Sequence, residues 1–303
     1  MKAKPFLKWA GGKSQLLEQL RAKYPKELEL GLIKNYYEPF LGGGAVFFDI
    51  FNSYSVEKFY LSDINEDLIL VYQVIQNEVE TLIELLQVYQ QDYSCLDNDK
   101  RKTYFFEIRE EYNQNRFHIH DKNLSQDWIF RAAQMIFLNK TCFNGLFRLN
   151  KTGGFNVPFG NYKNPKILDE SNLINVSQLL QGVDLKVADF SQLEKIITTD
   201  DSFVYFDPPY RPLSKTSAFT SYSKTSFDDQ AQIRLAKTFK VLNAKGIKLM
   251  LSNSDPKNVD KTDNFFETQY SGFHIQTVSA NRMINSVSTK RGKITELLIT
   301  NYN

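Results

Sequence analysis

The stretch of sequence that decides the fold is FVYFDPPY, residues 203–210. Its first four residues are apolar or aromatic and predict a buried β-strand. The two prolines cannot continue a strand ladder, and they hold the backbone extended. Asp207 therefore stands at the carboxyl end of a strand, the edge where open α/β sheets bind their ligands.

Asp207 and the carbonyl of Pro208 are two hydrogen-bond acceptors next to the ring of Tyr210. Such a set suits a planar ring that carries an amino group, because the acceptors bind its two N–H groups while the tyrosine stacks on the ring. A strand-terminating turn with a solvated aspartate is the alternative. The complete tetrapeptide directly after a strand favours the binding site.

Six further short runs have the same strand signature, being apolar and bounded by Gly, Asp, Asn or Pro. Helical periodicity lies between several of them, for example over residues 227–242. Strands that alternate with helices predict an α/β fold with a sheet covered on both faces. The seven predicted strands cover residues 36–40, 57–62, 185–187, 203–206, 247–251, 273–278 and 295–300.

A helical stretch interrupts this alternation. From residue 66 to 142, apolar residues recur at spacings of three and four, which indicates successive amphipathic helices. The sequence NGLFRLNKTGGFNVPFG then follows at 144–160 and predicts a β-hairpin or a pair of loops around a Gly-Gly turn. We therefore expect a helical insertion at 66–175 in a sheet domain formed by 1–65 and 176–303.

Composition bounds the class of protein. The 303 residues are 42% hydrophobic, enough for a large core and too many for a disordered chain. The two cysteines exclude a disulfide scaffold and fit a reducing compartment. Because no apolar run has the length of a signal peptide or a membrane span, we expect a soluble cytoplasmic protein without membrane association.

The net charge of +2 conceals an uneven distribution of charge. Three windows without any Asp or Glu, residues 1–17, 131–166 and 268–295, hold 14 of the 37 basic residues. The rest of the chain is acidic. This pattern indicates a basic footprint for a polyanion, with chance clustering as the alternative for any single window.

A second candidate binding element follows the first predicted strand. Gly42, Gly43 and Gly44 stand between that strand and a helix, so the backbone there can approach a ligand closely. Asp63 follows at the end of the next strand, where α/β nucleotide sites place a carboxylate for ribose hydroxyls. A helix cap is the alternative role of Asp63. Together the elements predict a nucleoside site.

Two other classes of site are excluded by spacing. The sequence GKS at 12–14 resembles the end of a phosphate-binding P-loop, but that motif requires a glycine where Leu7 stands. His118, His120 and His274 with the two cysteines form no metal-binding spacing, so we expect no metal.

The motifs, in order, resemble the Dam-type DNA adenine-N6 methyltransferases, the D12 class or alpha-group. The similarity runs from Lys8 to about residue 222 through KWAGGK (8–13), EPFLGGG (38–44), LSDIN (61–65), NGLFRLNKTGGFNVPFGNY (144–162), ADF (188–190) and DPPY (207–210). It implies S-adenosylmethionine as methyl donor and a Rossmann-like catalytic domain with an inserted target-recognition domain. The seven predicted strands and the helical insertion agree with this.

The resemblance also implies roles for individual residues. Asp207, Pro208 and Tyr210 would grip an adenine flipped out of duplex DNA. The cofactor would contact Trp9, Ala10, Gly11, Lys13, Glu38, Phe40, Gly42, Gly43, Gly44, Asp63, Asp189, Phe190 and Asp207. DNA would contact Lys8, Phe143, Asn144, Leu146, Arg148, Asn156, Pro158 and Tyr162.

The expected activity is therefore transfer of a methyl group to adenine N6 in double-stranded DNA, within GATC by resemblance. A methyltransferase acting on amino groups of RNA or protein is one alternative, and an inactive DNA-binding relative is another. The resemblance leaves open a cognate restriction endonuclease as a functional partner. We expect a monomer or a weak dimer.

Overall fold

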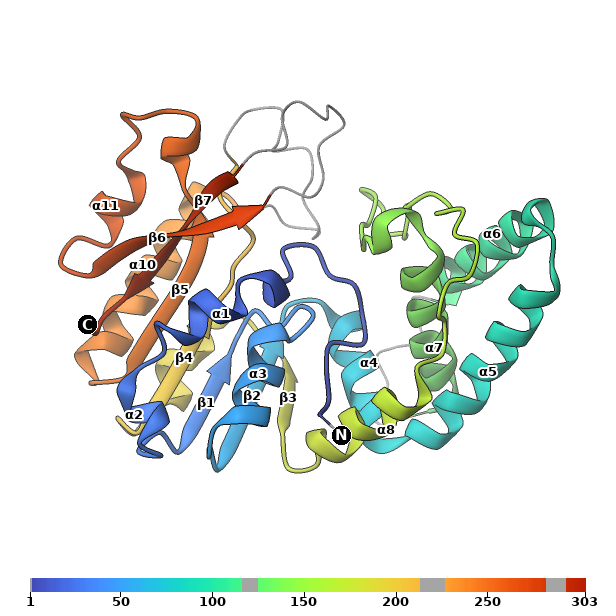
Figure 1. The fold of residues 1–303 in the computed structure, drawn as a ribbon, viewed down its shortest axis with the longest axis horizontal. Helices are drawn as coiled ribbons and strands as arrows, with labels where there is room; N and C mark the ends of the chain where they lie inside the picture. The colour runs from blue at the N-terminus through green and yellow to red at the C-terminus, as the bar shows by residue number, and fades with distance from the viewer. Residues whose placement is uncertain (1, 116–124, 213–226, 282–292) are drawn as a thin grey trace.

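The computed structural model describes residues 2–115, 125–212, 227–281 and 293–303. A seven-stranded sheet is covered by helices, and a helical insertion lies beside the β3 edge of the sheet (Figure 1). The predicted Rossmann-like α/β fold with seven strands is confirmed.

All seven predicted strands are present, with boundaries that shift by at most three residues. The sheet order is β3-β2-β1-β4-β5-β7-β6, and only β7 runs antiparallel to its neighbours. The order therefore reverses between β1 and β4, which places their carboxyl ends side by side. The strands are β1 (Asn35–Glu38), β2 (Lys58–Asp63), β3 (Asp184–Val187), β4 (Ser202–Phe206), β5 (Lys248–Ser254), β6 (His274–Asn281) and β7 (Lys293–Thr300).

Side chains that point alternately to the two faces of the sheet divide the core into two layers. In β4, Phe203 and Tyr205 belong to one buried cluster, and Val204 and Phe206 belong to the other. Successive side chains of a strand point to opposite faces, so a fully apolar strand needs helices on both sides. The first face is covered by α1 (Leu17–Arg21), α2 (Lys26–Glu29) and α3 (Ala45–Ser53), and the second by α9 (Leu193–Ile196), α10 (Asp229–Ala244) and α11 (Phe265–Gln269).

Five α-helices of the described residues lie between β2 and β3, where the sequence predicts the insertion at 66–175: α4 (Glu66–Asn77), α5 (Val79–Cys95), α6 (Asn98–Gln114), α7 (Gln126–Thr141) and α8 (Glu170–Leu180). The last of them, α8, continues past residue 175 to Leu180. Helix α4 packs against β2 and β3 and also against α7 and α8, so the first core layer continues from the sheet into the insertion. None of the described helices is long and apolar enough to cross a membrane.

The segment predicted as a hairpin or loop pair is a loop pair with little ladder. Its two arms meet in isolated antiparallel bridges, Cys142 with Phe159 and Leu149 with Phe155. At the turn, the Asn150 N–H donates to the carbonyl of Gly154 (2.8 Å), and Gly153 has φ 81°. The positive φ accounts for a glycine at this position.

A buried ion pair joins two helices of the insertion, α4 and α7. Arg131 in α7 is 3% exposed, and its guanidinium donates to both carboxylate oxygens of Asp67 in α4, at 2.6 and 3.1 Å. It also donates to the carbonyl of Tyr112 (2.7 Å) and lies over that ring. The pair leaves no buried charge uncompensated.

Removing one partner of this pair should destabilise the protein strongly. We expect Asp67→Ala to lower the free energy of unfolding by about 3–5 kcal/mol, because a buried guanidinium then has no counter-charge. Replacing both partners, with Asp67→Leu and Arg131→Met, should cost clearly less. Urea denaturation followed by circular dichroism measures both variants, and equal losses for the single and double variants would contradict the expectation.

Candidate active site

The carboxyl ends of β1 and β4 form the centre of the site. β4 ends at Phe206 and is followed by Asp207, and β1 ends at Glu38 and is followed by the glycine loop. Because the strand order reverses between these neighbours, their connections leave in opposite directions and open a crevice at this edge. The structure thus brings the two strongest sequence motifs together.

Lys13 connects the N-terminal segment to this centre. Its Nζ lies 2.8 Å from Oδ1 of Asp207 and donates to the carbonyl of Gly11 at 2.6 Å. The same ammonium lies 4.7 Å from the centre of the Tyr210 ring. Lys13 is 3% exposed, so its contacts with Asp207 and Tyr210 operate away from bulk water. Such contacts are stronger in a low dielectric.

Two carboxyl groups at the site have raised pKa values. Burial raises the pKa of Asp207 to about 6, an effect that the charge of Lys13 opposes and that of Glu296 reinforces. Burial raises the pKa of Glu38 to about 8, against the hydrogen bond from the Tyr36 hydroxyl (2.6 Å). At neutral pH the site therefore holds an ionised Asp207 beside a largely protonated Glu38.

The glycine loop is packed against Trp9. A Cβ on Gly42 would lie 2.8 Å from Cδ1 of Trp9, and one on Gly43 would lie 3.2 Å from its Cβ. The other neighbour of the indole is Phe147, stacked at 5.5 Å. The missing side chains of the glycines thus make room for the indole of Trp9. The sequence predicted that a ligand would approach the loop closely, and it did not predict this contact within the protein.

Asp63 holds the loop from the neighbouring strand. Its carboxylate accepts hydrogen bonds from the N–H groups of Gly42 (3.1 Å) and Asn65 (2.9 Å). The N-cap of α4 is Asn65 and not Asp63, because Asn65 accepts from the N–H of Leu68. Burial raises the pKa of Asp63. The alternative role of Asp63 as cap of α4 is therefore wrong.

Asp189 and Phe190 lie at the second face of the sheet. Asp189 accepts two hydrogen bonds from the guanidinium of Arg234 (2.5 and 2.9 Å), which lowers the pKa of Asp189 to about 2. The guanidinium also lies 4.2 Å from the centre of the Phe190 ring, which contacts Phe40 at 5.4 Å. Four predicted cofactor residues, Phe40, Asp63, Asp189 and Phe190, thus lie at the ends of β1, β2 and β3.

The turn after Asp207 is held by buried amides that sequence analysis missed. Asn253, at the end of β5, accepts from the N–H of Arg211 (3.1 Å) and donates to Gln232 of α10 (3.1 Å). Gln232 in turn donates to the carbonyl of Pro209 (3.0 Å). Both amides are at most 1% exposed. The polar run SNSD at 252–255, directly after an apolar strand, was the available signal.

A second cluster joins Lys8 to the loop pair. Asn139 of α7 accepts from the Lys8 N–H (2.9 Å) and donates to the carbonyls of Lys8 and Gly145. The Lys8 ammonium lies 4.8 Å from the ring centre of Tyr162. A Cβ on Gly145 would lie 2.4 Å from the Lys8 side chain, so only glycine fits there. Lys8 and Tyr162 of the predicted DNA set are therefore neighbours.

The other residues of this set lie along the two arms of the loop pair. The guanidinium of Arg148 donates to the side chain of Asn156 (2.8 Å), and the N–H of Phe143 donates to the carbonyl of Pro158 (2.8 Å). The Phe143 side chain is 53% exposed, although it is a large apolar group. The neighbouring Asn144 and Pro158 are exposed, and Leu146 is half-buried.

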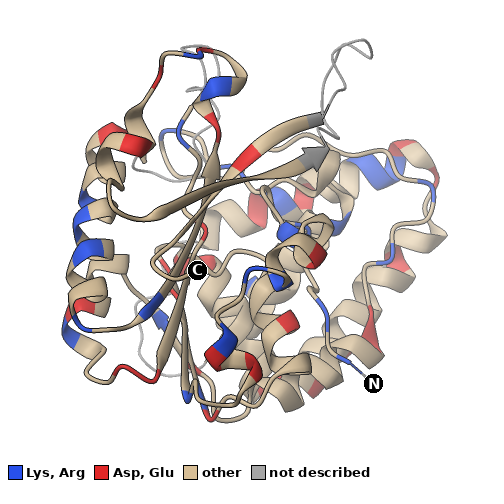
Figure 2. Cartoon of the chain, turned by 60° about the vertical axis from the view of Figure 1, so that its left-hand side comes forward, with Lys and Arg blue, Asp and Glu red and all other residues tan. Residues whose placement is uncertain are grey.

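The structure modifies the predicted basic footprint. Lys13 and Arg131 belong to acid-free windows, yet both are buried in ion pairs and cannot contribute to a basic surface. Basic and acidic residues are interspersed along the outer helices (Figure 2). Arg282, Lys290 and Arg291 of the third window lie outside the described residues, as do His118 and His120.

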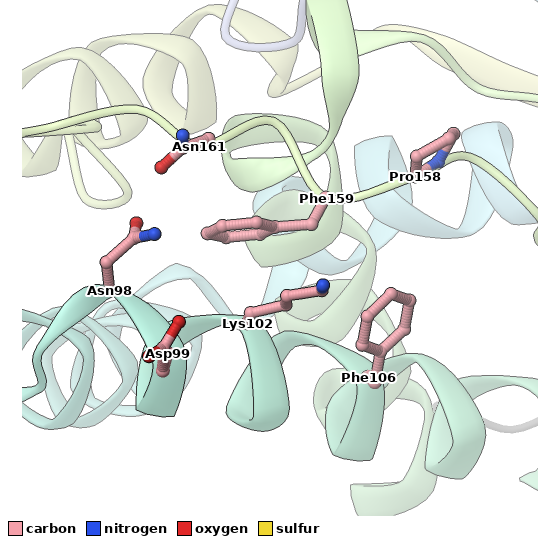
Figure 3. Close-up of a pocket in the computed structure, with 7 residues that line it drawn as sticks. All are labelled: Asn98, Asp99, Lys102, Phe106, Pro158, Phe159 and Asn161. Carbon is pink, nitrogen blue, oxygen red and sulfur yellow. The ribbon is translucent and has the colours of Figure 1, made fainter.

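A hollow on the insertion includes Pro158 of the predicted DNA set but none of the residues at the carboxyl ends of β1 and β4. It has a volume of about 330 Å³ and lies between α6 and the far arm of the loop pair (Figure 3). Its lining residues are Asn98, Asp99, Lys102, Phe106, Pro158, Phe159 and Asn161. Across the described ranges, no group of three or more His, Cys, Asp or Glu is arranged to hold a metal ion.

Comparison with known proteins assigns the family. Residues 9–284 match the family model of the D12 class N6 adenine-specific DNA methyltransferases. The chain is 53% identical to the Type II methyltransferase M.MjaIII of Methanocaldococcus jannaschii, over the full length of both proteins. It is 39% identical to the Type II methyltransferase M1.LlaDCHI of Lactococcus lactis subsp. cremoris, over 99% of this chain and 95% of that one. It is 32% identical to the DNA adenine methylase of Escherichia coli K12, over 98% of this chain and 95% of that one.

The match spans both motifs at the sheet edge, the glycine loop and the DPPY turn, together with the whole inserted segment. It supports the predicted adenine-specific DNA methyltransferase over the two alternatives. The chain belongs to the D12 class of N6 adenine-specific DNA methyltransferases, and it is an adenine-specific DNA methyltransferase.

Proposed function

We propose that the enzyme transfers a methyl group from S-adenosylmethionine to N6 of the adenine in GATC, with the base flipped out of duplex DNA into the site at Asp207–Tyr210. The observation that carries this proposal is Asp207, a half-buried carboxylate that directly follows β4 and shares the Lys13 ammonium with the ring of Tyr210. A base inside the duplex is out of reach of such a site, so the adenine must leave the stack.

Asp207 activates the adenine amino group by accepting a hydrogen bond from one of its two N–H groups. The carbonyl of Pro208 accepts the second, and Tyr210 supports the ring. With both hydrogens engaged, N6 can move toward tetrahedral geometry, and its lone pair would form the new N–C bond as the bond between the methyl group and the donor's sulfur breaks. The methylated N6 would then lose one proton, which the ionised Asp207 is placed to take. Positioning and electrostatic stabilisation supply the catalysis, and no covalent enzyme intermediate is needed.

The residues at the sheet edge fit S-adenosylmethionine. The N–H groups of Gly42 and Gly44 are bound within the protein, so the glycine loop contributes a backbone without side chains. Asp63 offers a carboxylate for ribose hydroxyls, and Phe190 offers a buried ring next to Phe40. Lys13 is a buried ammonium that can meet a carboxylate. When bound, the cofactor supplies an activated methyl group on a sulfonium. Asp189 already accepts two hydrogen bonds from Arg234. A ligand could therefore use only those lone pairs of the Asp189 carboxylate that Arg234 leaves free.

The insertion at 66–175 is the proposed target-recognition domain. The exposed ring of Phe143 suits a wedge between stacked bases. Arg148 has a guanidinium oriented by Asn156, and arginine forks read the O6 and N7 atoms of guanine. Lys8 stands next to the same loop pair through Asn139. These contacts support recognition of a short site from both the sheet domain and the insertion.

The rate of methyl transfer should follow the ionisation of Asp207. The raised pKa of about 6 means that below this pH the carboxyl becomes protonated and loses an acceptor. At saturating cofactor, we expect the single-turnover rate to fall about tenfold per pH unit below that midpoint and to level off above it. Lys13→Met should move the midpoint to higher pH, because Lys13 lowers the pKa of Asp207.

Two variants control this measurement. Asp207→Ala should be slower by about 10²–10³-fold at every pH, which is the typical cost of losing a positioned hydrogen-bonding group. Asp260→Ala removes an exposed carboxylate elsewhere and should keep the wild-type profile. A wild-type rate that is flat between pH 5 and 7 would remove Asp207 from this role.

Arg148 and Lys163 should affect recognition differently. Arg148→Ala should weaken discrimination by about 1–3 kcal/mol at one base position, because it removes a base-reading fork. Lys163→Ala, in an exposed position, should weaken binding to all sequences alike and reduce its salt dependence. Binding to duplexes with single base changes, measured at several salt concentrations, separates the two. An equal loss on cognate and altered sites for Arg148→Ala would contradict base reading.

The target sequence can be tested on plasmid DNA. After treatment with the protein and S-adenosylmethionine, GATC sites should resist a nuclease blocked by adenine methylation. They should become sensitive to a nuclease that requires that methylation. Asp207→Ala protein provides the matched control. If the blocked nuclease still cuts while methyl groups are found at other adenines, the GATC assignment is wrong and the chemistry stands.

A further inference from the structure

Tyr210 is held by contacts at its edge as well as at its face. Its hydroxyl donates to Oε2 of Glu296 at 2.5 Å, and the Lys13 ammonium lies over the ring. A hydroxyl-to-carboxylate bond of this length belongs to the strong, charge-assisted class. The ring that is proposed to stack on adenine is therefore fixed at its far end by a carboxylate.

The sheet topology explains how Glu296 reaches this place. In β7, Glu296 pairs with Ser254, the last residue of β5, and with Val278 of β6. Because β7 is antiparallel, its N-terminal half lies at the edge where the parallel strands end. β5 is the direct neighbour of β4. A rigid strand thus carries the carboxylate to the turn that follows Asp207.

The side-chain chemistry makes this contact directional. A tyrosine side chain has two rotatable bonds, and its hydroxyl oxygen lies on the axis of the second, so a fixed oxygen sets χ1 and the place of the ring. The plane of the ring is set by the preference of the phenolic O–H bond to lie in that plane while it points at Oε2 of Glu296, and by the Lys13 ammonium over the ring face. Burial, together with the neighbouring negative charges of Asp207 and Glu296, raises the pKa of Tyr210, which keeps the phenol protonated as the donor of this bond.

We propose that Glu296 is a positioning residue for methyl transfer, which holds the ring of Tyr210 in the orientation that stacks on the target adenine. The inference rests on the proposed binding of adenine at Asp207 and Tyr210. Glu296 contacts neither base nor cofactor in this scheme and acts through the tyrosine alone. Its removal should therefore lower the rate of the chemical step and leave cofactor binding unchanged.

The test is a double-mutant cycle with a conservative replacement. Glu296→Leu removes the acceptor, Glu296→Gln keeps an amide oxygen in its place, and Tyr210→Phe removes the donor but keeps the ring. The double variant Glu296→Leu/Tyr210→Phe completes the cycle. Glu57→Gln removes a carboxylate that is 63% exposed and pairs with Lys34, and it serves as the control. Single-turnover rates, cofactor affinity and melting temperature are measured for each.

We expect Glu296→Leu to slow methyl transfer about tenfold or more through loss of orientation, with cofactor affinity unchanged within about twofold. Glu296→Gln should stay within about threefold of wild type, since an acceptor remains. Tyr210→Phe should be slowed like Glu296→Leu, and the double variant should be no slower than the slower single variant, because both changes break one interaction.

Three results would overturn the inference while leaving the enzyme's activity intact. These are a wild-type rate for Glu296→Leu, equal defects for the Gln and Leu variants, and rate losses that multiply in the double variant. If Glu296→Leu does not fold, Tyr210→Phe decides, because a wild-type rate for that variant makes the hydrogen bond dispensable. Failure of the wild-type protein itself to methylate adenine would instead overturn the proposed function, and this inference with it.

Discussion

The reversal of strand order between β1 and β4 is the constraint on which the site depends. It places two carboxyl ends next to each other, and their connections depart on opposite sides. One connection is the glycine loop, and the other is the Asp-Pro-Pro-Tyr turn. A ligand that contacts both must lie across this crevice. In the proposed function, the fold itself thus brings the methyl donor and the target base to the same place.

The electrostatics of the crevice depend on one buried cation. Lys13 lies within reach of Asp207 and over Tyr210, and it opposes the rise of the pKa that burial gives both Asp207 and Glu38. Without such a counter-charge, a buried carboxylate takes up a proton and loses its capacity to accept. The N-terminal segment is therefore an integral part of the site, although it precedes the first strand.

The same segment joins the sheet domain to the insertion. Trp9 lies between the glycine loop and Phe147, and Lys8 is fixed by Asn139 of α7. The core is also continuous between the two parts, because α4 packs against β2 and β3 as well as against α7 and α8. A loop pair held in this way keeps a defined position relative to Asp207, which a protein that reads bases and modifies one of them requires.

The seven strands, the helices between β2 and β3 and the motifs at the carboxyl edge could all be predicted from local sequence patterns. Apolar runs, proline and glycine influence the backbone conformation locally. FVYFDPPY and the glycine loop therefore indicate the end of a strand without knowledge of the rest of the fold. The family also follows from these motifs, because their order and spacing are specific. The roles of Asp207 and Tyr210 in binding adenine remain predictions. The structure adds the positions of both residues relative to Lys13.

Only the tertiary structure decided which distant residues complete the site. Gln232, Asn253 and Glu296 come from three different elements, and no local pattern links them to Tyr210 or Pro209. The burial of Lys13 and Arg131, which sequence alone assigned to a basic surface, is also a tertiary property. The physical reason is that hydrogen bonds and ion pairs across the sheet depend on strand order and register, which set distances between residues far apart in the chain.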